Sequence, residues 1–142
     1  MNEVTQYCTF VVDGQFYGVR VQVVQEVIRY QQMTTVPLAP REIGGLINLR
    51  GQIVTAIDMR RRLELSDRAD NQKPMNVVIR TDEGAISLLV DEIGEVVSTD
   101  PSTFEPPPET LQGTARTLID GVYKLKNRLL LVLNTDKAVN VC

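Results

Sequence analysis

The sequence predicts a mainly β protein that folds as two small barrels, and three observations support this prediction. Short runs rich in Val, Ile and Leu recur along the 142 residues and are separated by turn signals, which is the pattern of paired strands. The chain also repeats itself internally, and its helical signals are few and short. The expected hairpins join residues 9–12 to 16–21, 45–49 to 53–57, 75–80 to 85–90, and 118–125 to 129–133.

Helices are expected in only three places. Residues 58–65 begin with Asp58 and residues 134–139 begin with Asn134, and both residue types are good N-caps. Residues 21–28 place their valines on one side of a helical wheel, which taken alone favours a helix. The matching segment of the second half contains Gly94 and β-branched residues, so we expect one helical turn at 21–24 followed by a strand at 25–30.

The internal repeat is the most informative feature of the sequence. Residues 45–58 align without gaps on residues 121–134, an offset of 76, and their hydrophobic positions, turn and helix cap coincide. Upstream, Asp13-Gly14 and the strand after it correspond to Glu83-Gly84 and the strand after that. Two similar halves of about five strands each are typical of paired small barrels.

The repeat also suggests where the subdomains divide. We expect the first barrel over residues 14–73, the second over residues 74–133 together with an N-terminal strand at 7–13, and a C-terminal helix and tail at 134–142. Residues 66–74 form the only long polar stretch, and we interpret them as a surface loop that links the halves.

Composition excludes several classes of function. The chain has no histidine, which removes the usual general base and the commonest metal ligand, and we expect no enzyme, no cofactor and no metal. A net charge of −3 argues against a nucleic-acid or membrane-surface binder. Cys8 and Cys142 lack CxxC spacing and are expected to be ordinary thiols in a reducing compartment. The longest apolar run, residues 129–133, is too short to span a bilayer, so we expect a soluble, cytoplasmic protein.

The charged residues give one candidate contact. Residues 60–62 are three consecutive arginines, which we interpret as a solvated helix face. The acidic pairs at 82–83 and 91–92 are expected to cap and solvate strand ends. Arg50 is conspicuous at a hairpin turn where Asn or Asp is easier, and it is equally well explained as an exposed turn residue or as a partner contact.

Several stretches of the sequence are informative together because of their order and spacing. They are residues 16–19, 24–29, 36–37, 40, 43–51 (IGGLINLRG) and 57–60 in the first half, and residues 89–91, 95–97, 105–108, 121–122 and 128–133 in the second. In this order they resemble the CheW family of bacterial chemotaxis coupling proteins. The resemblance covers about residues 7–140. It implies two SH3-like five-stranded barrels with a groove between them, and an adaptor without enzymatic activity. Family members link the cytoplasmic hairpin tips of chemoreceptors to the regulatory domain of the histidine kinase CheA in membrane-associated arrays.

The resemblance also implies two sets of site residues. The receptor contact would lie at or near Val24, Glu26, Gly45 and Arg50, and the kinase and ring contacts at Ile43, Leu46, Glu105, Pro106, Pro107 and Pro108. Arg20 and the pair Thr55-Ala56 depart from the family pattern and leave open which receptor or pathway the chain serves. The alternative function is a small-ligand-binding barrel that uses the groove, for which no sequence feature speaks.

Overall fold

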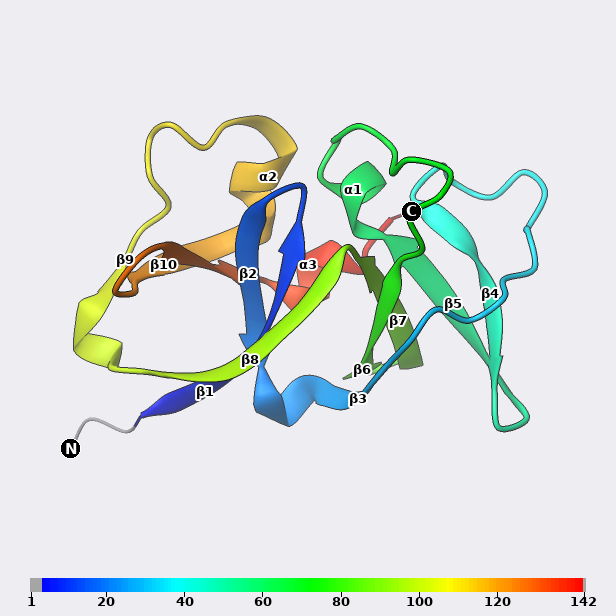
Figure 1. The fold of residues 1–142 in the computed structure, drawn as a ribbon, viewed down its shortest axis with the longest axis horizontal. Coiled ribbons are helices and arrows are strands. Elements are labelled where there is room, and N and C mark those ends of the chain that lie inside the picture. Colours follow the sequence, from blue (N-terminus) through cyan, green and yellow to red (C-terminus); the bar gives the residue numbers. More distant parts are fainter. Residues whose placement is uncertain (1–3, 142) are drawn as a thin grey trace.

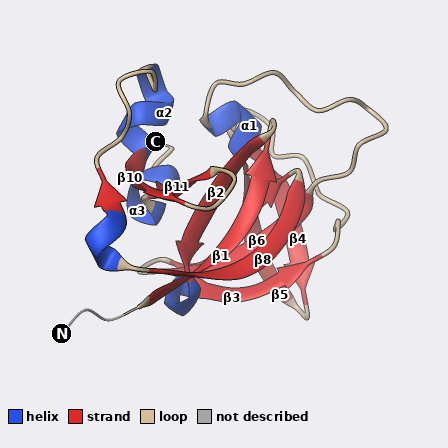
Figure 2. Ribbon diagram, turned by 60° about the vertical axis from the view of Figure 1, so that its left-hand side comes forward, coloured by secondary structure: helices blue, strands red, loops and turns tan. Residues whose placement is uncertain are grey.

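The structure is a computed structural model that describes residues 4–141. Strands are the main secondary structure, and the helices are short pieces between them (Figure 2). The strands are β1 (Thr5–Val12), β2 (Gln15–Arg20), β3 (Val24–Ile28), β4 (Ile43–Leu49), β5 (Gln52–Asp58), β6 (Met75–Thr81), β7 (Gly84–Val90), β8 (Glu92–Thr99), β9 (Phe104–Glu105), β10 (Ile119–Lys124) and β11 (Leu129–Leu133). The helices are α1 (Met59–Arg62), α2 (Gly113–Leu118) and α3 (Thr135–Ala138), with 3-10 turns η1 (Val21–Val23) and η2 (Pro101–Thr103).

The strands form two sheets, one for each subdomain. The six-stranded sheet has the order β8-β1-β2-β11-β10-β9, and the five-stranded sheet has the order β3-β6-β7-β5-β4 (Figure 1). The four expected hairpins are present as the antiparallel pairs β1–β2, β4–β5, β6–β7 and β10–β11. The predicted helical turn and strand after residue 20 are confirmed as η1 and β3. The mainly β fold with two subdomains is therefore confirmed.

The two halves of the sequence exchange hairpins. The hairpin β1–β2 pairs with β8 and β11 of the second half, whereas β6–β7 pairs with β3 and β5 of the first half. The strand division thus differs from the expected boundaries, because β2 joins the second-half strands and β6 and β7 join the first-half strands. Parallel pairs such as β2–β11 need a long crossover connection, and a local sequence pattern does not say which strand that connection reaches.

The sheets are related by an approximate internal symmetry. Strands β3, β6, β7, β5 and β4 correspond in order to β8, β1, β2, β11 and β10. The amide of Asp58 donates to the carbonyl of Glu42 at 2.8 Å, and the amide of Asn134 donates to that of Leu118 at the same distance, again 76 residues on. Asp58 and Asn134 cap α1 and α3 through their side-chain oxygens, as predicted.

One apolar core joins the two sheets. Its central cluster contains Phe10 and Val19 from the six-stranded sheet together with Ile57 and Leu88 from the five-stranded sheet, all nearly inaccessible to solvent. Burying such side chains removes about 1.5–3 kcal/mol of unfavourable hydration each. The subdomains are therefore held against one another by shared packing, which fixes the relative positions of their surfaces.

Three local details differ from the sequence predictions. The turn between β6 and β7 is formed by Asp82 and Glu83, one residue earlier than expected. The helix α2 occupies a polar stretch that has no marked helical pattern, and its last residue, Leu118, had been expected to begin a strand. The N-cap of α2, Gln112, makes no side-chain cap bond, so the usual start signal is missing.

Cys8 lies half-buried on β1 as a free thiol, and burial raises its pKa, which fits an unreactive cysteine. Cys142 lies outside the described residues. No helix within residues 4–141 is long and apolar enough to cross a membrane.

Candidate partner-binding surfaces

The structure brings Glu26 and Arg50 together. Glu26 lies on β3 at one edge of the five-stranded sheet, and Arg50 lies in the turn between β4 and β5 at the opposite edge. The guanidinium Nη2 of Arg50 donates a hydrogen bond to the carboxylate of Glu26. The sheet therefore curls far enough for its two edges to meet through this pair.

The turn that carries Arg50 has an unusual backbone for an arginine. Arg50 and Gly51 both have left-handed dihedrals, with φ of 53° and 87°, which is the pattern of a two-residue type I′ hairpin turn. Asn48 Oδ1 accepts a hydrogen bond from the amide of Gly51 at 2.9 Å. Holding a non-glycine residue in this region costs about 1–2 kcal/mol. The Arg50 side chain stays 73% exposed, so it is an exposed turn residue that retains donors for a further contact.

Val24 lies two residues before Glu26 on β3, whereas Gly45 lies five residues before Arg50 on β4, and both are less accessible than Arg50. Val24 is half-buried against the shared core, and its carbonyl accepts from Arg80 Nη1 at 3.3 Å. Gly45 is buried, and a Cβ atom there would meet Met33 Cβ and the carbonyl oxygen of Thr34 at 2.9 Å each. Gly45 thus allows the segment before β4 to lie against that strand, and its contribution to any contact is through the backbone.

The predicted kinase contacts lie at opposite ends of the molecule. Ile43 and Leu46 are on β4, whereas Glu105 is on β9 and is followed by the three prolines (Figure 1). Thr34 pairs with Leu46 at one end, and Glu105 pairs with Val122 at the other. Since Leu46 and Val122 are 76 residues apart, the two pairings are equivalent in the internal symmetry. The molecule therefore presents two similar outer ends.

Sequence reasoning missed a cavity of mixed polar and apolar lining at the β4 end. A hollow of about 590 Å³ lies beside Leu46 and Ile53, and Met33 also lines it. Ile53 is 62% exposed, and its repeat equivalent Leu129 is exposed at the other end. The internal repeat could have predicted this pair of exposed residues, because it aligns Ile53 with Leu129 and both follow a hairpin turn.

A buried network of charges joins the two subdomains. It corrects the predictions that residues 60–62 form a solvated helix face, that Asp91 is a solvated strand end, and that residues 66–74 are only a surface loop. Arg60 donates to Asp91 through Nε at 3.0 Å and Nη2 at 2.7 Å, and Arg68 Nη1 binds both oxygens of Asp58 at 3.1 Å. Arg68 Nε lies 2.8 Å from Asp91 Oδ1, although it is not aligned for a hydrogen bond. The Arg68 and Asp91 side chains are only 7% and 6% exposed. Arg60 is thus not part of a solvated face, and the polar linker inserts a buried arginine.

The network controls the ionisation of its members. Burial alone would raise the pKa of Asp91, but the hydrogen bonds from Arg60 and from the Asp13 amide, together with the charge of Arg68, hold this pKa below its ordinary value. The pKa of Arg60 is raised, chiefly by its hydrogen bond to Asp91. Asp91 is therefore charged near neutral pH and offsets the buried arginines.

Comparison with known proteins decides the family. The CheW-like domain family model matches residues 6–141. The chain belongs to the CheW-like domain family. It is 30% identical to a chemotaxis protein CheW of Bacillus subtilis over 131 residues, which cover 92% of this chain and 84% of that protein. It is 25% identical to the CheW of Treponema pallidum over 140 residues, covering 96% and 82% of the two chains.

A solved structure supports the same assignment. The crystal structure of the scaffolding protein CheW from Thermoanaerobacter tengcongensis superposes with a TM-score of 0.82 at 26% identity, and the match covers 93% of this chain and 90% of that one. The relatives are named chemotaxis proteins and the solved neighbour is named a scaffolding protein, which supports the prediction of a chemotaxis scaffold or adaptor. The comparisons do not favour the small-ligand alternative.

Proposed function

We propose that this CheW-like chain is a cytoplasmic adaptor that couples the hairpin tips of chemoreceptors to the histidine kinase CheA in membrane-associated arrays. The observation that carries the proposal is the family match over residues 6–141, which includes every segment of the candidate surfaces. The fold supports it physically, because one rigid body with separate surfaces can hold two partners at a fixed geometry.

The receptor contact is assigned to the region around the Glu26–Arg50 pair. The exposed guanidinium of Arg50 offers charged donors, while Glu26 holds it in place. Val24, two residues before Glu26 on the same strand, is half-buried and places apolar surface beside the charges. An amphipathic receptor helix would place apolar residues against Val24, and the charges would set its register.

The kinase contact is assigned to the outer ends of the molecule. Ile43 and Leu46 mark one end, and residues 105–108 mark the other. Family resemblance implies that such ends pack against the similar barrels of the CheA regulatory domain. Two similar ends on one molecule allow it to bridge two neighbours, which is what a ring requires.

Two separate binding measurements test this proposal. The purified chain is titrated against membranes that contain chemoreceptors and, separately, against the isolated regulatory domain of CheA. We expect saturable binding to each, with receptor binding weakened on substitution of Arg50 and kinase binding retained. Failure to bind either partner would overturn the proposal.

A further inference from the structure

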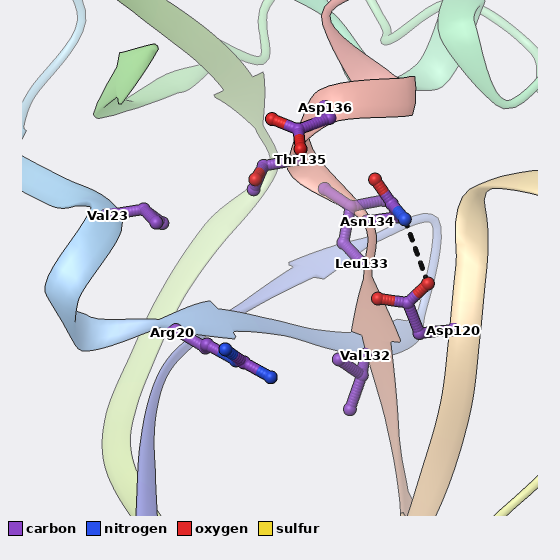
Figure 3. A pocket seen from close by; sticks show the side chains of 8 residues that line it. All are labelled: Arg20, Val23, Asp120, Val132, Leu133, Asn134, Thr135 and Asp136. Carbon is purple, nitrogen blue, oxygen red and sulfur yellow. Dashed lines mark hydrogen bonds between the residues drawn. The ribbon is translucent and has the colours of Figure 1, made fainter. Parts of the chain in front are cut away.

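A polar cavity of about 300 Å³ opens beside the start of α3 in the six-stranded subdomain. Arg20, Asp120, Asn134 and Asp136 supply its polar wall, and Val132 supplies part of its apolar wall (Figure 3). None of these residues belongs to the receptor or kinase surfaces assigned above.

Two parallel strands separate beside this cavity. Strands β2 and β11 are paired only at Tyr17 with Leu131 and at Gly18 with Val132. The equivalent strands β5 and β7 stay paired over four positions, as far as Asp58 with Leu89. The six-stranded sheet therefore opens at the level of Asn134, where the five-stranded sheet is still closed.

The equivalent place in the other subdomain already holds a guanidinium group. By the internal repeat, Asn134 corresponds to Asp58, and the matching strand registers place Arg20 at the position of Leu89. Arg68 enters that place, where Nη1 binds both oxygens of Asp58 and Nη2 donates to the carbonyl of Leu89 at 3.1 Å, and a hollow of about 290 Å³ remains beside it. The chain thus carries an occupied version of the same site.

The open site retains acidic groups to receive such a cation. The cap residue has become an amide, but Asn134 Nδ2 donates at 2.9 Å to Oδ1 of Asp120, which stands where the five-stranded sheet has Gly44 (Figure 3). Asp136 adds a second carboxylate to the wall. Within the described part of the chain, neither carboxylate forms a salt bridge. The negative charge that a guanidinium would meet therefore lies on Asp120 and Asp136, and not on the cap residue Asn134.

The residues that follow α3 run away from the cavity. Arg62 of the five-stranded subdomain binds the carbonyls of Ala138, Lys137 and Asn140 at 2.9, 2.8 and 3.2 Å. These contacts direct residues 138–141 toward the turn between β6 and β7. The described C-terminal residues therefore leave the cavity open.

We propose that the cavity binds the guanidinium group of an arginine side chain presented by a partner protein. The proposal follows from the occupied twin site and from the two unpaired carboxylates, and it does not depend on the receptor and kinase contacts. Arg20 contributes the opposing charge in the wall, so it weakens the binding of an arginine and its removal strengthens it. An acidic occupant would show the reverse dependence on Arg20.

A nuclear magnetic resonance titration of the full isotope-labelled chain tests the proposal. The probe is N-acetyl-L-arginine amide, the neutral control is N-acetyl-L-citrulline amide, and the acidic control is N-acetyl-L-glutamate amide. We expect saturable shifts of the amide signals of residues 20, 120 and 134–136 with the arginine probe alone. Equal shifts with citrulline, saturable binding of the glutamate probe, or no saturable shift would overturn the proposal.

Variants then locate the site. Replacing both Asp120→Asn and Asp136→Asn is expected to weaken the arginine probe about tenfold, which corresponds to the loss of about 1.4 kcal/mol. Arg20→Ala should tighten it, and Asp70→Asn, an exposed change in the linker that lines neither this cavity nor the hollow beside Asp136, should leave it unchanged. The near-isosteric changes and an unchanged spectrum elsewhere verify that the fold is intact. Unaltered affinity in the double variant, or loss of affinity in Arg20→Ala, would contradict the assignment.

Discussion

Glu26 and Arg50 are 24 residues apart, on opposite edges of the five-stranded sheet, and they form an ion pair. Glu26 is mostly covered, with 20% of its side chain exposed, whereas Arg50 is largely exposed. The pair therefore holds an arginine in a defined position on the surface. Since exposed pairs contribute at most about 1 kcal/mol to stability, its main effect should be on recognition.

The first prediction concerns this pair. Arg50→Ala or Glu26→Lys should weaken receptor binding by about 1–3 kcal/mol while changing the unfolding free energy by less than about 1 kcal/mol. Lys126→Ala is the matched control, because Lys126 lies in the equivalent turn of the other sheet. Titration with receptor-bearing membranes and urea unfolding give the two quantities. Equal receptor affinity in all three variants would exclude the assigned contact.

The second prediction separates structure from contact at Gly45. Gly45→Ala places a Cβ atom 2.9 Å from two neighbouring atoms at a φ of 155°, and should lower the unfolding free energy by about 2–4 kcal/mol. Gly51→Ala, where φ is 87° and nothing lies within 4 Å of the added atom, should cost about 1–2 kcal/mol. Urea unfolding of both variants checks this order, and equal losses would show that the close approach at Gly45 is unimportant.

The third prediction concerns pH. Because the folded-state pKa of Asp91 lies below its ordinary value, the unfolded chain binds more protons in mild acid. The stabilisation is thus complete above about pH 5 and declines as the pH falls through the ordinary carboxyl pKa of about 3.9 toward the folded value. The slope of unfolding free energy against pH should flatten in Asp91→Asn and stay unchanged in the exposed Asp82→Asn. A wild-type slope in Asp91→Asn would refute this role.

Removing the same carboxylate should also be costly near neutral pH. Asp91→Ala leaves Arg60 and Arg68 buried without one of their partners and should cost about 3–5 kcal/mol. Thermal or urea unfolding at pH 7 measures this loss. A cost below about 1 kcal/mol would mean that water compensates the arginines.

The fourth prediction concerns the outer end at β4. Ile53→Glu adds a charge to an exposed apolar residue beside the cavity at Leu46, and should weaken binding of the CheA regulatory domain about tenfold without changing receptor binding. Val4→Glu is the control, because Val4 is 63% exposed and precedes β1. Calorimetric titration with the regulatory domain provides the affinities. If Ile53→Glu binds like the wild type, the kinase contact lies elsewhere.

The strands could be predicted from the sequence because their signals are local. The alternation of apolar residues and the turns at Asp13-Gly14 and Arg50-Gly51 depend only on neighbouring residues. The exchange of hairpins between sheets could not be predicted in this way, because it depends on which strand a long connection reaches. The repeat indicated two equivalent halves, but it did not indicate that the hairpins β1–β2 and β6–β7 would be exchanged between the two sheets.

The same distinction explains the site. Family resemblance implied Glu26 and Arg50 separately, but their ion pair arises only when the sheet curls. The sequence predicts that Arg60 and Arg68 are solvated, because most of their sequence neighbours are polar. In the structure both are buried in ion pairs with Asp91, which is distant in sequence. A buried charge depends on a partner that tertiary structure provides, and composition does not reveal it.

The most direct test of the adaptor function measures kinase control in a reconstituted complex. Receptor-bearing membranes and CheA are combined with the wild-type chain, with Arg50→Ala, or with no added chain, and kinase autophosphorylation is measured in the sedimented fraction. We expect the wild-type chain to bring CheA to the membranes and to make its activity depend on the receptors, and we expect Arg50→Ala to do so poorly. Equal co-sedimentation and equal kinase activity with and without the wild-type chain would contradict the adaptor function.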